Sequence, residues 1–118
     1  MYTIAQELKL NALQGTVVQQ ICFSLNTVYI YFEDKGSIQI NSSFIIKSKG
    51  IVGWYDVYPI TCDNGLLQIL EKKVIKICAD ENKKNLILEF EEGISLELIN
   101  DELYESFTVS VGGITTII

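Results

Sequence analysis

The sequence predicts an α+β fold, mainly antiparallel β, in which two helix–β–β–β repeats pack into one sandwich or barrel-like core. Three observations predict it. A chain of 118 residues fits one domain. Val, Ile, Tyr, Phe and Thr are frequent and proline occurs once, which favours strands over helices. Several segments alternate between apolar and polar residues, and the segments of the second half resemble those of the first.

The first half is expected to begin with a short amphipathic helix at residues 3–13. Apolar residues recur there near helical spacing, Thr3 and Gln6 resemble a capping box, and Gly15 ends the helix. Strands are expected at residues 17–23, 28–32 and 37–46, with turns at 25–27 and 34–36.

Residues 47–63 are expected to form a connector with at most one irregular edge strand. This stretch holds Gly50, Gly53, Trp54 and the only proline, Pro59. Asp63 then resembles the N-cap of a short helix at 65–71. The remaining strands are expected at 74–78, 86–90, 94–99, 104–111 and 114–118.

An internal repeat organises this single domain, with repeat one at about 4–46 and repeat two at about 64–111. Residues 32–40 align with 90–98 without a gap, and 18–22 align with 74–78. Upstream, Leu13 aligns with Leu70, which places Lys72 where repeat one has Gly15. The apolar positions expected to face the core are Val28, Ile30, Phe32, Ile38 and Ile40 in one repeat, and Leu86, Leu88, Phe90, Leu96 and Leu98 in the other.

The charge is unevenly distributed between the two repeats. The formal net charge is −6, and residues 85–118 carry seven acids and no base. On the outward positions, Tyr31 and Gln39 of repeat one correspond to Glu89 and Glu97 of repeat two. Such a field repels the phosphates of nucleic acids and attracts basic proteins. An acidic surface that only keeps the domain soluble is the alternative.

Catalytic chemistry is not expected. The chain has no histidine, no glycine-rich phosphate loop and three cysteines without a CxxC pair, so we expect reduced thiols, no metal and no cofactor. Adjacent carboxylates such as Glu91 and Glu92 are ordinary in turns. The N-terminus lacks the pattern of a secretory signal and no apolar run could span a bilayer, so a cytoplasmic protein is expected.

A family resemblance rests on the residues of the repeat. Leu13–Gly15 before a strand, Phe32–Gly36 and Phe90–Gly93 at hairpins, and Tyr104–Phe107 near the end resemble a group of small bacterial two-repeat domains. Some of that group are immunity proteins of polymorphic toxin or contact-dependent growth inhibition systems. The likeness covers about residues 10–111, and Lys72 in place of a glycine departs from the pattern.

The resemblance implies a monomeric immunity protein that binds one cognate toxin domain as a 1:1 heterodimer. The expected toxin is a basic nuclease, ribonuclease before deoxyribonuclease, whose cleft an acidic face would cover. The expected contact residues are the carboxylates and two aromatic anchors: Glu89, Glu91, Glu97, Asp101, Glu102, Glu105, Trp54 and Tyr55. Trp54 could instead close one end of the core.

The alternative function is a structural or scaffold subunit that self-associates without a toxin. The apolar C-terminal residues Ile114, Ile117 and Ile118 would then form an exposed edge strand.

Overall fold

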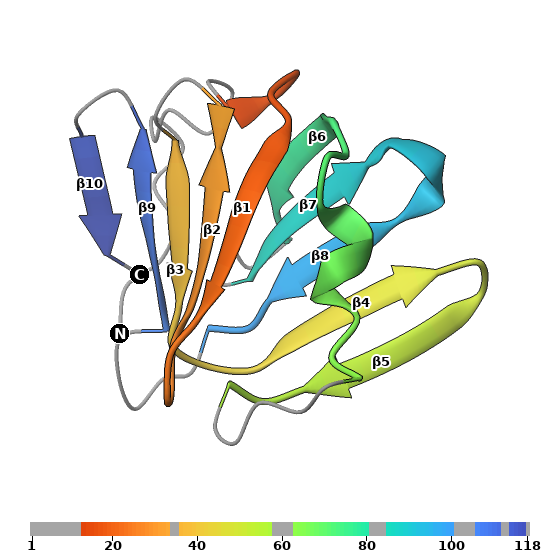
Figure 1. Cartoon of the computed structure of the whole chain (residues 1–118), viewed down its shortest axis with the longest axis horizontal. Coiled ribbons are helices and arrows are strands. Elements are labelled where there is room, and N and C mark those ends of the chain that lie inside the picture. Colours follow the sequence, from red (N-terminus) through yellow and green to blue (C-terminus); the bar gives the residue numbers. More distant parts are fainter. Residues whose placement is uncertain are drawn as a thin grey trace.

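The computed structural model describes residues 13–33, 36–57, 63–80, 85–100, 106–111 and 114–117. These residues form ten strands in two five-stranded antiparallel sheets, with only short 3-10 turns between them (Figure 1). The strands of the first half are β1 (Val18–Phe23), β2 (Val28–Phe32), β3 (Ser37–Ile40), β4 (Phe44–Ser48) and β5 (Ile51–Tyr55). Those of the second half are β6 (Val74–Ala79), β7 (Leu86–Phe90), β8 (Ser95–Leu98), β9 (Phe107–Val111) and β10 (Ile114–Ile117).

The expected α+β fold of two helix–β–β–β repeats is wrong, because the described residues are nearly all β and form two antiparallel sheets. The predicted helix at 65–71 is one 3-10 turn, η3 (Leu66–Ile69), because Leu70 is already extended and Glu71 is left-handed, with φ 67°. Asp63 is not its cap; the Oδ1 atom of Asn64 accepts a hydrogen bond from the Leu66 N–H instead (2.8 Å). Apart from Leu13, the helix expected at 3–13 lies outside the described residues.

The predicted connector is a regular hairpin, β4–β5, joined by the two-residue turn Lys49–Gly50. Both turn residues have positive φ (53° and 81°), which fits the twist of a tight hairpin. The single strand expected at 37–46 is two strands, because residues 41–43 carry the chain from one sheet to the other.

Each sheet combines strands from both halves of the chain. One sheet has the order β1-β2-β3-β9-β10 and the other β5-β4-β8-β7-β6 (Figure 1). Strands β1 to β3 of the first half share a sheet with the last hairpin of the second half, β9–β10. Strands β6 to β8 of the second half share the other sheet with the last hairpin of the first half, β4–β5. Neither half has a complete sheet of its own.

The hydrogen bonds repeat with the same pairing in both halves. Phe44 of β4 lies opposite Leu98, and Phe107 of β9 lies opposite Ile40. A β-bulge interrupts β1 between Val18 and Gln20 and β6 between Val74 and Lys76. Strands β1 and β6 meet where Val17 and Lys73, one from each half, form an antiparallel bridge. The molecule has an internal pseudo-twofold relation at this bridge.

This relation corrects the repeat alignment by one residue. The Thr16 N–H donates to the carbonyl of Leu13 (3.1 Å), and the Lys72 N–H donates to that of Ile69 (3.0 Å). Leu13 is thus equivalent to Ile69 rather than to Leu70, and Gly15 is equivalent to Glu71. Both Gly15 and Glu71 have positive φ, 89° and 67°.

Replacing Glu71 by glycine should stabilise the fold by about 1 kcal/mol, because a left-handed backbone strains a residue with a Cβ atom. Gly15→Ala should destabilise it by a similar amount, since an added Cβ would contact nothing and only the backbone conformation opposes it. Chemical denaturation of both variants checks this. A loss of stability in Glu71→Gly would contradict the equivalence.

One hydrophobic core lies between the two sheets. All ten apolar positions expected to point inward are buried in it, so this prediction is confirmed. The exchanged hairpins add Phe44, Ile46, Phe107 and Val109, and the cluster also includes Leu66 and Ile69 of η3. The opposite positions of the strands form two outer faces.

Candidate binding face on the second sheet

The outer face of the second sheet is defined by two rows of side chains that cross five strands. The first row runs through Trp54, Ile45, Glu97, Ile87 and Cys78. The second row runs through Val52, Lys47, Ser95, Glu89 and Lys76.

Two of the expected carboxylates, Glu89 and Glu97, lie on this outer face. Glu97 is flanked by Ile45 and Ile87, and its carboxylate accepts a hydrogen bond from the side-chain amide of Asn85 (3.0 Å). Glu89 lies opposite Lys76 of β6. The expected residues Asp101, Glu102 and Glu105 lie outside the described residues.

The charge of the outer face is more mixed than the sequence of residues 85–118 indicates. Strand β4 of the first half brings Lys47 into the row of Glu89, and β6 brings Lys76. Cross-strand contacts between opposite charges favour the sheet by a few tenths of a kcal/mol or more. In its two rows, the outer face therefore carries two lysines, Lys47 and Lys76, together with its two carboxylates, Glu89 and Glu97.

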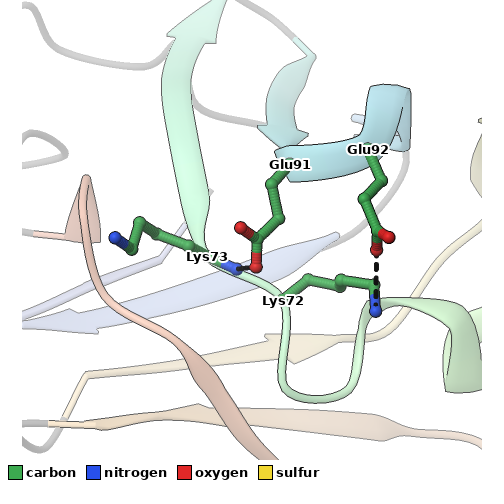
Figure 2. A network of polar contacts seen from close by, with 4 residues as sticks. All are labelled: Lys72, Lys73, Glu91 and Glu92. Carbon is green, nitrogen blue, oxygen red and sulfur yellow. Dashed lines mark hydrogen bonds and ion pairs between the residues drawn. The ribbon is translucent and has the colours of Figure 1, made fainter.

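Glu91 holds the backbone of a turn rather than standing free on the outer face. Its Oε1 atom accepts a hydrogen bond from the Lys73 N–H (3.0 Å), as Figure 2 shows. In the first half, Glu33 Oε1 accepts the N–H of Val17 in the same way (3.1 Å). Because both halves share this hydrogen bond, the carboxylate of Glu91 has a structural function.

Glu92 forms an ion pair with Lys72 at the same turn, with Oε2 and Nζ 2.8 Å apart (Figure 2). Their side-chain hydrogen bond and then their Coulombic attraction lower the pKa of Glu92 and raise the pKa of Lys72. Any stability from this exposed pair is lost when the pH falls through the folded-state pKa of Glu92 or rises through that of Lys72. Because the pair is exposed to solvent, its contribution to stability is small and is screened by salt.

The two expected aromatic anchors point to opposite sides of the sheet. Trp54 lies on the outer face and is 61% exposed, so the alternative in which it closes the core is wrong. Tyr55 is half-buried on the core side, where its ring packs against Phe44 with 5.6 Å between ring centroids. Trp54 alone is available to a partner on the outer face.

Strand β5 also exposes Ile51 (74%) and Val52 (62%), which are not among the expected contact residues. Lys49-Gly50 is not one of the dipeptides typical of a tight hairpin turn, so the sequence carries no clear signal for this hairpin. A hollow of about 180 Å³ lies between this hairpin and η3, lined by Ile46, Ser48, Lys49, Ile51, Gly53, Tyr55 and Gln68.

The outer face of the first sheet has a different chemistry. Its rows hold Cys22, Tyr29, Gln39 and Thr108, and Gln20, Tyr31, Ser37, Ser110 and Thr115. No member of these rows is charged. Among the rows of the two outer faces, charged side chains therefore occur only on the second sheet.

Neither a metal centre nor a relative points to a reaction. Within the described ranges, no three His, Cys, Asp or Glu side chains are grouped as metal ligands would be, and Cys22 and Cys78 are free thiols. No helix among these residues is long and apolar enough to cross a bilayer. Searches of protein-family models, curated proteins and solved structures found no match to the chain.

Proposed function

We propose that this chain is a cytoplasmic immunity protein that binds and neutralises a cognate toxin domain, with a basic nuclease, ribonuclease first, as the target. The toxin partner comes from the family resemblance of the repeat motifs. The observation that supports a binding function most directly is Trp54, a large and largely exposed aromatic residue on the open sheet face that carries Glu97. Tryptophan is among the residues that contribute most to protein interfaces.

In the proposed complex, Trp54 and its neighbours Ile45 and Val52 form the apolar centre of the contact. Glu97 lies two strands away from β5 and Glu89 lies three strands away, and both carboxylates meet basic residues of the toxin cleft. Charged residues at an interface chiefly increase the association rate, which suits an inhibitor that must act before its target does. Inhibition is stoichiometric and requires no chemistry from this chain.

The test uses the C-terminal domain of the protein encoded directly upstream of this chain's gene as the toxin. Replacing both Glu89 and Glu97 by lysine should slow association with it by about tenfold or more and abolish protection of cells that express it. Raising the ionic strength should slow association of the unchanged protein. It should also reduce the difference in association rate between the unchanged protein and the double variant. Stopped-flow association rates and growth of co-expressing cells measure the two effects.

The matched control replaces Glu71 and Glu92 by lysine. Both residues are exposed and outside the two rows of the outer face, and the net charge changes by the same amount. This control should keep protection and most of the association rate. If the Glu89/Glu97 variant and the Glu71/Glu92 control associate with the toxin equally slowly, net charge rather than this face determines the association rate. If neither variant loses protection, the proposed site is rejected.

A further inference from the structure

Strand β5 forms an edge of the second sheet, since β4 is its only partner among the described strands. Edge strands are usually protected by a charge, a proline or a bulge that prevents another strand from pairing with them. Residues 51–55 contain no charge and no proline, and their pairing with β4 has no register shift. Ile51, Val52 and Trp54 are exposed on this same strand. Among the described strands, the two register shifts lie in β1 and β6 instead.

The hairpin determines which backbone groups of β5 face the open edge. In a two-residue hairpin, the residues flanking the turn, here Ser48 and Ile51, exchange backbone hydrogen bonds, and the pattern alternates from there. Ile51, Gly53 and Tyr55 thus direct their amide groups toward β4. Val52 and Trp54 direct theirs outward, away from the sheet.

We propose that β5 pairs antiparallel with β5 of a second copy of this chain, around a twofold axis at Gly53. In this register, Val52 of one copy exchanges backbone hydrogen bonds with Trp54 of the other. The two Gly53 residues lie opposite each other as a non-hydrogen-bonded pair. The result is one continuous ten-stranded sheet. Residues that lie directly opposite each other in a sheet point to the same face. When two identical strands pair around a twofold axis, one residue must therefore lie opposite the same residue of the other copy.

Charge complementarity identifies the occupant as a second copy. Strand β5 has Lys49 just before its start and Asp56 just after its end. Antiparallel pairing around Gly53 places Lys49 of one copy within one residue of Asp56 of the other, twice per dimer. The apolar residues also match, since each exposed Trp54 meets an exposed Val52, and aromatic with β-branched pairs favour a sheet.

The pseudo-equivalent edge strand β10 is less suited to apolar pairing with a second copy than β5. Thr115 occupies the position of Val52 and is exposed, which places a polar side chain where β5 has an apolar one. Self-association is thus assigned to the hairpin of the first half, not to the C-terminal strand named in the sequence-based alternative. Because Val52 and Trp54 belong to both proposed contacts, a bound toxin and a second copy would compete for the same strand. The dimer proposal rests on the edge of β5 and does not depend on the proposed function.

The test is the oligomeric state of the full chain at micromolar concentrations, measured by sedimentation equilibrium. Val52→Pro removes an N–H that faces only the open edge, so the monomer should fold while the dimer dissociation constant rises at least about tenfold. Thr115→Pro is the matched control on β10 and should leave the dimer intact. Lys49→Asp, which places like charges near each Asp56, should also weaken the dimer and confirms the interface should Val52→Pro not fold.

Three results would overturn the proposal. The unchanged chain could sediment as a monomer across the micromolar range. The dimer could survive both Val52→Pro and Lys49→Asp. Thr115→Pro could dissociate it while the β5 variants do not, which would place the contact on β10.

Discussion

Replacing Phe44 by alanine should lower the free energy of unfolding by about 3–5 kcal/mol, and Phe107→Ala should do the same. Both rings are fully buried, and each begins the hairpin that one half contributes to the sheet of the other. A cavity at either position removes contacts from both sheets, because the ring lies where the chain crosses between them. The loss is large against the ~5–15 kcal/mol of a typical domain. Urea denaturation measures it.

Thr108→Ala provides the control for this pair. Thr108 follows Phe107 on β9 but points to the outer face and is half-exposed, so its replacement should cost less than about 1 kcal/mol. The informative comparison is between the two phenylalanines. If one replacement unfolds the protein and the other costs about as little as Thr108→Ala, the hairpins are not energetically equivalent and the pseudo-twofold relation is only geometric.

Gly36→Ala is the second large effect, with an expected loss of about 1–3 kcal/mol. A Cβ atom at Gly36 would overlap with Cδ2 of Leu13, which is itself buried in the core. The equivalent residue of the second half is Ile94, since the N–H groups of Phe32 and Phe90 donate to the carbonyls of Gly36 and Ile94 at 2.8 Å. In the first half, the side chain of Leu13 occupies the space that a side chain at position 36 would need.

A double-mutant cycle isolates this contact. In a Leu13→Ala background the clash is gone, so Gly36→Ala should cost less there, with a coupling of about 0.5–3 kcal/mol. Both steps are followed by thermal and urea unfolding. Equal costs in the two backgrounds would mean that the penalty at Gly36 comes from its own backbone conformation and not from Leu13.

The strands of the repeat could be predicted because their signal is local. Alternation in residues 28–32 and 86–90 requires only that one side of a strand be apolar, and all five alternating apolar positions in each repeat are buried. The hairpin at residues 47–55 was missed for a local reason as well. Two glycines and a tryptophan resemble a loop, and the positive φ that identifies Lys49–Gly50 as a tight turn is visible only in the backbone.

The candidate site could be predicted only in part. Glu89, Glu97 and the exposed Trp54 were selected from the sequence and lie on one face. Glu91 was selected with them, but its carboxylate caps the backbone of Lys73, a residue eighteen positions away. Tyr55 faces the core, because successive residues of a strand point to opposite sides.

That two similar halves share one core, and which side chains enter it, can be predicted from the residues alone, because burial of apolar residues at period two depends on neighbours along the chain. The exchange of the last hairpins between the two sheets is visible only in the folded molecule. That exchange places Lys47 and Trp54 of the first half on the same face as Glu89 and Glu97 of the second. The surface chemistry of this protein is therefore a property of strand order, which residues distant in sequence determine together.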